Sequence, residues 1–364
     1  MSLRPVRIAG DCRQDVILSV LFIFGWLFRE KDFIDTMKRI LFFALMIFFA
    51  GSSLAQLPKR MELPALKFSS ENQSSLYSLV CKTCAENDAY SFEDEDYADD
   101  WAKHPKERMG AAFMVTLMHV QRSLEGVSVR DIAVVAKTFL DDFLVAEGKK
   151  VPAAYPFNYK AYKNCVDSFL APVYDRMTGG SQFEMNQCAY ADSERSRFLT
   201  ILNNFLVESR FKQSNLKAAF EAEEDAWLRL RDCLGDVVYN YKVEINGGIG
   251  YSMLPLEVAG VKFRADEVRN QSAGILYAVS REDSGVVAAP MEDEFDDSTL
   301  ADSFKSIKEE GKGVDITELT ENWNRFLSCR NEVEALLPAS AKTLYNKDTQ
   351  RYKMFIANFV QTEY

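Results

Sequence analysis

Apolar residues recur at helical spacing along most of this chain, and no stretch alternates between apolar and polar residues as a half-buried strand does. The clearest helical pattern spans residues 215–241. Its apolar seam positions are Phe220, Trp227, Leu234 and Tyr241, spaced seven residues apart, with Leu230 and Val237 between them. Such a heptad pattern predicts one long helix whose seam packs against a neighbour. We therefore expect an all-α fold built from helical hairpins or bundles.

Similar patterns predict further helices on both sides of this one. The expected ranges are 75–86, 108–124, 129–147, 162–176, 182–211 and 261–279, with helical residues again from 300 onward. Ser128 and Asp131 form a capping-box pair at the start of the third range. Gly179, Gly180 and Ser181 interrupt the pattern, and we place a domain boundary there.

The first 55 residues are predicted to direct export. Two apolar runs, 16–28 and 40–50, are each shorter than the roughly 20 residues that span a bilayer. Basic residues precede the second run and small residues follow it, which is typical of a signal peptide at Met37–Ala55. We interpret residues 1–36 as a spurious upstream extension. A periplasmic or secreted bacterial protein with no stable membrane span after cleavage is expected, and a two-segment membrane anchor is the alternative.

The mature chain is then divided into four regions. Residues 56–178 form an N-terminal helical domain of unknown type, 179–281 a second helical domain, 282–299 an acidic linker and 300–364 a C-terminal helical region. The last region is interpreted as a degenerate copy of the preceding hairpin. The reason is that Trp323 stands before Cys329 at the same spacing as Trp227 stands before Cys233.

Charge and composition narrow the function classes. The formal net charge is -11, and residues 56–364 alone carry 36 basic and 49 acidic side chains. An acidic surface disfavours nucleic acid and anionic lipid and favours a basic protein partner. The chain has only 2 histidines, which disfavours zinc enzymes, Ser-His-Asp hydrolases and Cys-His nucleophile pairs. We expect no catalytic residue, cofactor or metal site.

Two sets of side chains are candidates for a chemical role: the acids and arginines of residues 223–231, and the cysteines. The adjacent acids Glu223, Glu224 and Asp225 are expected to lie on a solvated helix face, with Arg229 and Arg231 pairing with carboxylates such as Asp225. Six cysteines remain after signal removal, and an even number in an exported protein predicts disulfides without fixing their pairing. They are Cys81, Cys84, Cys165, Cys188, Cys233 and Cys329. The CxxC of the first two is expected to be a structural pair, because no strand precedes it.

Two motifs at a defined separation resemble a known family. Met185-Asn186-Gln187-Cys188-Ala189 lies on one predicted helix, and Ala226-Trp227-Leu228 with Arg231-Asp232-Cys233 lies on the next. With the following Gly-rich loop and an arginine-bearing third helix, residues 181–278 resemble the LprI-type lysozyme-inhibitor domain, a small helical module of exported bacterial proteins.

The resemblance carries specific expectations for residues. It implies that Cys188 and Cys233 are structural cysteines joined in a disulfide worth about 2–4 kcal/mol. It also implies that Trp227 is a core residue, that Arg231 is the arginine before the second cysteine, and that Arg264 or Arg269 is the arginine of the third helix. The chain departs from the family in its nearest upstream cysteine, Cys165, which is more distant than usual.

We therefore expect an exported, non-catalytic protein-binding module. The resemblance implies a lysozyme (muramidase) inhibitor that captures a basic enzyme with its acidic surface. One alternative is an envelope structural or assembly factor with helical docking surfaces. Another is an enzyme that uses carboxylates on a helical scaffold.

Overall fold

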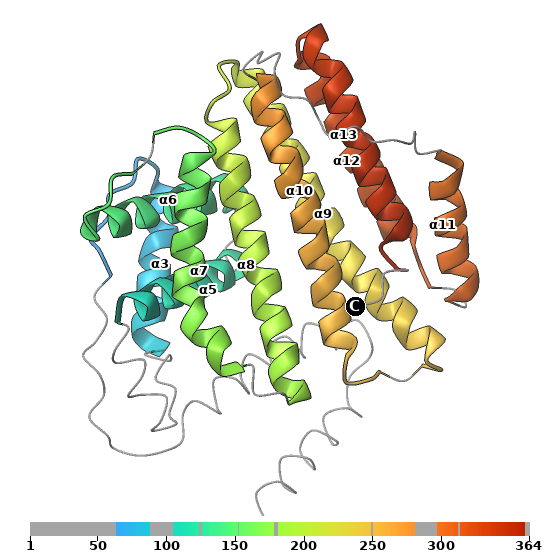
Figure 1. The fold of residues 1–364 in the computed structure, drawn as a ribbon, viewed down its shortest axis with the longest axis horizontal. Coiled ribbons are helices and arrows are strands. Elements are labelled where there is room, and N and C mark those ends of the chain that lie inside the picture. Colours follow the sequence, from blue (N-terminus) through green and yellow to red (C-terminus); the bar gives the residue numbers. More distant parts are fainter. Residues whose placement is uncertain are drawn as a thin grey trace, which may run out of the picture. The chain divides into compact units, whose positions relative to one another are not determined.

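The computed structural model describes residues 63–87, 105–123, 126–151, 153–177, 181–248, 250–280, 297–311 and 314–360. The described residues form ten helices and no strand (Figure 1), which confirms the all-α expectation. The helices are α3 (Glu71–Asn87), α5 (Pro105–Ser123), α6 (Val129–Ala146), α7 (Phe157–Met177), α8 (Gln182–Glu208), α9 (Ser214–Ile245), α10 (Leu254–Ser280), α11 (Asp297–Glu310), α12 (Thr317–Leu336) and α13 (Ala339–Asn358).

Several predictions concern other parts of the chain. The upstream extension 1–36, the signal peptide 37–55 and most of the linker 282–299 lie outside the described residues. Within the described part, no helix combines the length and the apolar character that crossing a membrane requires.

The N-terminal helices pack through aromatic side chains. The rings of Phe113 and Phe139 stack with centroids 3.8 Å apart, and Phe143 meets Phe169 edge to face at 4.7 Å. Gly110 lies directly against Phe169, where an added Cβ would come within 2.4 Å of the ring. The predicted capping box is confirmed, since the Ser128 hydroxyl accepts from the Asp131 backbone N–H at 3.1 Å.

The central helices α7, α8, α9 and α10 run alternately up and down in Figure 1. Although α8 and α9 are consecutive, α8 packs mainly on α10, and α9 packs mainly on α12. Helix α8 also contacts α5, α6 and α7. It therefore touches helices on both sides of the boundary predicted at 179–181, and all described helices belong to one compact unit.

The predicted seam of α9 is confirmed, because all six of its apolar positions are buried. The Trp227 ring lies 5.0 Å from that of Phe326 on α12 and 4.8 Å from that of Tyr352 on α13. Helices α12 and α13 thus cover the seam. Helix α10 begins at Leu254, earlier than predicted, because Pro255 lies in the first turn, where its missing N–H costs no hydrogen bond.

Candidate functional site

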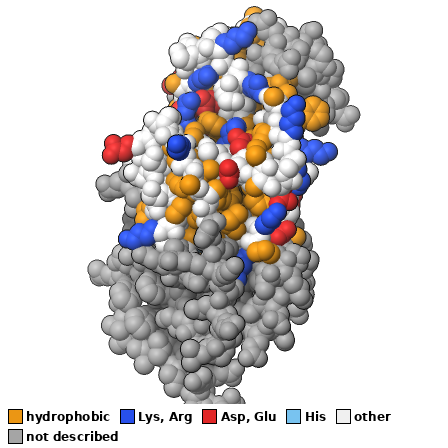
Figure 2. Space-filling view, turned by 90° about the vertical axis from the view of Figure 1, so that its left-hand side faces the viewer, with side chains coloured by type: hydrophobic (Ala, Val, Ile, Leu, Met, Phe, Trp, Pro, Cys, Tyr) orange, Lys and Arg blue, Asp and Glu red, His pale blue; other side chains and the backbone are white. Residues whose placement is uncertain are grey.

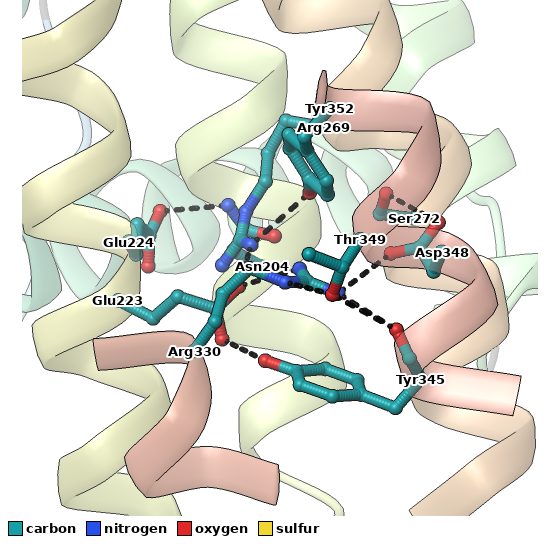
Figure 3. Close-up of polar contacts among 10 residues, drawn as sticks. All are labelled: Asn204, Glu223, Glu224, Arg269, Ser272, Arg330, Tyr345, Asp348, Thr349 and Tyr352. Atoms are coloured by element: carbon teal, nitrogen blue, oxygen red, sulfur yellow. Dashed lines mark hydrogen bonds and ion pairs between the residues drawn. The ribbon is translucent and has the colours of Figure 1, made fainter. Parts of the chain in front are cut away.

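A buried carboxylate lies at the centre of the C-terminal helices. Glu223 projects from α9 towards side chains of α10, α12 and α13 (Figure 3). It accepts hydrogen bonds from Arg269 Nη1 at 2.5 Å, from Arg330 Nη1 at 2.9 Å and from the Tyr345 hydroxyl at 2.5 Å. The prediction that residues 223–225 form a solvated face is therefore wrong for Glu223 and Glu224, because α12 and α13 cover this part of α9.

Arg330 connects this carboxylate to α13. Its Nε donates to Thr349 Oγ1 at 3.0 Å, and its Nη2 donates to the Tyr345 carbonyl at 3.1 Å and to Asp348 Oδ2 at 3.2 Å. The other Asp348 oxygen accepts from the Ser272 hydroxyl of α10 at 2.9 Å. The guanidinium of Arg330 on α12 therefore joins α9 and α13 directly, and Asp348 extends the connection to α10.

The second arginine, Arg269, has a less complete set of partners. Its Nη1 also donates to the Tyr352 hydroxyl at 3.3 Å, while its Nε and Nη2 have no hydrogen-bond partner. The guanidinium carbon lies 4.9 Å from the centroid of the Phe220 ring. Nearby, Glu224 accepts from Asn204 Nδ2 at 3.2 Å. We call Glu223, Arg269, Arg330, Tyr345 and Asp348 the central ion network.

The two adjacent glutamates differ in ionisation. Burial alone would raise the pKa of Glu223, but Arg269, Arg330 and the Tyr345 hydroxyl hold that pKa below its ordinary value. Burial raises the pKa of Glu224 well above its ordinary value, and Arg269 and Asn204 offset only part of this effect. Glu223 is therefore a permanent counter-ion, and Glu224 favours its protonated form.

A second buried cluster surrounds Arg231. Its Nε donates to Asp266 Oδ2 of α10 at 2.8 Å, and its Nη2 donates to the Ser193 carbonyl of α8 at 2.8 Å. The Ser196 hydroxyl donates to the same Asp266 oxygen at 2.6 Å. Burial raises the pKa of Asp266 to about 6, with Arg231 opposing the shift. Arg231 thus pairs with Asp266, and with Asp232 at 2.9 Å, instead of with Asp225.

The structure separates the two candidates for the third-helix arginine. Arg269 is completely buried, whereas Arg264 is only partly buried and donates to the Phe359 carbonyl at 3.2 Å. Trp227 and Trp323 are both buried around Phe326, so the two tryptophans of the predicted internal copy lie in one core.

The six cysteines of the described residues are free thiols in the structure, so the predicted disulfide between Cys188 and Cys233 is not confirmed. The two cysteines lie on helices with different main neighbours, since α8 packs mainly on α10 and α9 mainly on α12. The Cys233 thiol interacts with Asn322 of α12, and burial raises its pKa to about 12.

The predicted pairing of Cys81 with Cys84 is likewise not confirmed, because both are free thiols in the structure. Cys84 Sγ lies 3.1 Å from Thr116 Oγ1, and burial raises the pKa of Cys84 to about 11. Burial raises the pKa of Cys81, Cys165 and Cys329 as well. Reactive thiolates need a lowered pKa. These environments therefore do not favour redox chemistry at the CxxC.

The first turns of α8, which carry the Met185–Ala189 motif, are partly exposed. Ser181 and Glu184 make a capping box there, and Asn186 Nδ2 donates to the Ser252 carbonyl before α10 at 2.7 Å. Phe183 and Tyr190 are 66% and 43% exposed, although both are large aromatic side chains. Phe183 and Tyr190 are seven residues apart and therefore lie on the same side of α8, and we call these two residues the α8 surface. The Met185–Ala189 motif therefore lies partly in solvent, next to the loop that precedes α10.

Sequence reasoning missed the central ion network, although one signal for it was present. Glu223 lies three residues after Phe220 and four before Trp227, so it occupies a seam position of the heptad. A charged residue at a buried seam position predicts a buried partner. In the described part of the chain no three His, Cys, Asp or Glu side chains are grouped as metal ligands.

Comparison with known proteins adds no relative. No protein-family model matches the chain, and no curated protein or solved structure matches it.

Proposed function

We propose that this chain is an exported, non-catalytic helical binding protein whose partner is a basic protein. A muramidase is the partner class that the LprI-type resemblance implies. The proposed binding site is the α8 surface, and the central ion network is the scaffold that holds the helices behind it.

The positions of the motif residues support a scaffold role. By the resemblance, Trp227 and Arg231 correspond to family positions, and Arg269 is one of two candidates for a third position; all three residues are completely buried. The guanidinium groups of Arg231 and Arg269 pair with carboxylates of neighbouring helices. Glu223 and Glu224 are buried as well, so the acids that most resemble a catalytic pair do not face solvent. This arrangement favours binding over carboxylate catalysis.

The exposed aromatic residues of the α8 surface are the observation that carries the proposal. Tyrosine and phenylalanine are enriched in protein interfaces. The segments that flank them, residues 182–196 and 232–262, contain seven acidic and three basic residues. An apolar centre within an acidic surrounding is complementary to a cationic protein, and it would speed the encounter at low ionic strength.

A binding and activity measurement tests the proposal. Purified residues 56–364 would be titrated with basic lysozymes of several types by calorimetry, and muramidase activity would be followed in parallel. We expect saturable binding that weakens as the salt concentration rises, because screening shortens the reach of exposed charges. Binding without inhibition would retain a binding protein and reject the inhibitor. Absence of both at micromolar protein would reject the muramidase partner.

A second candidate function is supported by a different surface. On the side where α3 and α6 lie, hydrophobic side chains gather in the middle of the described surface, and Lys and Arg lie around them (Figure 2). Such a face fits an envelope assembly factor that docks through its N-terminal helices. Co-purification of one stoichiometric envelope protein, without any effect on lysozyme, would favour this function over the first.

A further inference from the structure

A cavity of about 380 Å³ opens at the opposite end of α8 from the α8 surface. It lies between α6, the connection before α7, the first turn of α7 and the end of α8. Basic, polar and apolar side chains line it, among them Lys137, Tyr155, Asn158, Leu206, Ser209 and Arg210. The volume falls within the range of about 300–1,000 Å³ that is typical of small-molecule sites.

The charge of this cavity is opposite to that of the whole protein. Lys137 and Arg210 line it, and no acidic residue does, although the chain carries a net charge of -11. Lys137 pairs with Asp141 one turn further along α6. Arg210 donates to the Ala153 carbonyl and forms no ion pair with a described carboxylate. A guanidinium without a carboxylate partner presents its remaining N–H groups to an anion.

Asn158 contributes a polar side chain to the cavity wall and is 7% exposed. Burial raises the pKa of Tyr155 to about 12, so its phenol is neutral at physiological pH. Leu206 gives an apolar wall beside these groups.

We propose that this cavity binds a small organic anion whose carboxylate or phosphate group lies on Arg210 and Lys137. The ligand class follows from the two cations, the uncharged polar side chains of the wall and the size of the cavity. The site is separate from the α8 surface, so it adds to the proposed function without depending on it.

Calorimetry with the purified protein tests this site. The probes are gluconate and glucose 6-phosphate, which share hydroxyls but differ in the acid group, and uncharged glucose. We expect at least one anion to saturate the protein below about 10 mM and glucose to show no binding at that concentration. The stronger of the two anions identifies the acid group that the site prefers.

Two variants give the control. Arg210→Gln should weaken anion binding at least about tenfold, because a charge-assisted hydrogen bond is lost. Lys212→Gln removes an exposed charge two residues further along, outside the cavity, and should leave binding within about twofold. If Arg210→Gln does not fold by circular dichroism, Lys137→Gln takes its place. Lack of saturation by both anions, equal binding of glucose, or equal effects of Arg210→Gln and Lys212→Gln would overturn the proposal.

Discussion

At the scale of single residues, we expect substitution of Glu223 to cause the largest loss of stability. Glu223 is the only carboxylate that Arg269 Nη1 pairs with among the described residues, and Arg330 shares it with Asp348. Glu223→Gln preserves the shape of the side chain but leaves buried positive charge uncompensated, which costs about 3–5 kcal/mol of unfolding free energy. Urea denaturation followed by circular dichroism measures this loss.

A matched variant shows whether the effect belongs to the network. Glu221→Gln lies on the same helix, is half-buried and approaches Arg130 only at 3.7 Å. Its effect should be about 1 kcal/mol or less. Equal losses for Glu221→Gln and Glu223→Gln would contradict the assignment of Glu223 as the central counter-ion.

Replacing Glu224 should increase stability instead of decreasing it, and the size of this increase should depend on pH. The folded-state pKa of Glu224 is raised, so at rising pH the unfolded chain releases this proton before the native protein does. Ionisable Glu224 therefore lowers stability as pH rises above the ordinary glutamate pKa. Glu224→Gln should leave stability unchanged at pH 4 and increase it on the order of 1–3 kcal/mol at pH 8. Exposed Glu244→Gln is the control, and a gain that is equal at both pH values would disprove the explanation.

At the scale of helices, the sequence predicted which faces are buried but not which helices meet. The heptad of α9 correctly identified its seam, because apolar spacing reports burial directly. It did not reveal that α12 supplies Arg330, since the partner lies 107 residues away from Glu223 in the sequence. For the same reason, the adjacency of α8 and α9 in sequence suggested a hairpin, whereas their main neighbours are α10 and α12.

The cysteines test this helix arrangement. Because Cys188 and Cys233 are free thiols on helices with different main neighbours, denatured protein should take up iodoacetamide at both positions without reductant. Cys188→Ser should change stability by about 0.5 kcal/mol or less, as for a surface substitution. Peptide mass mapping is the measurement. A Cys188–Cys233 cross-linked peptide would instead restore the staple that the family resemblance implies.

At the scale of the whole molecule, the polar interior and the exposed α8 surface have separate effects. The ion network joins α9, α10, α12 and α13, so its loss lowers stability across these helices and any surface that they support. Phe183 and Tyr190 lie outside this network, and their loss should affect association more than stability. This difference makes the proposed binding role testable without unfolding the protein.

The combined change Phe183→Ser and Tyr190→Ser is therefore expected to weaken binding of a basic lysozyme by about 2 kcal/mol or more, as for interface hot spots. Its melting temperature should stay close to that of the unaltered protein, because Phe183 is 66% exposed and Tyr190 is 43% exposed, so neither belongs to the buried core. Phe157→Ser is the control, since Phe157 on α7 is also 66% exposed but lies outside the α8 surface. Calorimetry at two salt concentrations measures the contribution of charge and the contribution of the aromatic contacts to binding. If all three proteins bind equally, the partner does not use the α8 surface; if binding is lost only at high salt, charge contributes more than the aromatic contacts do.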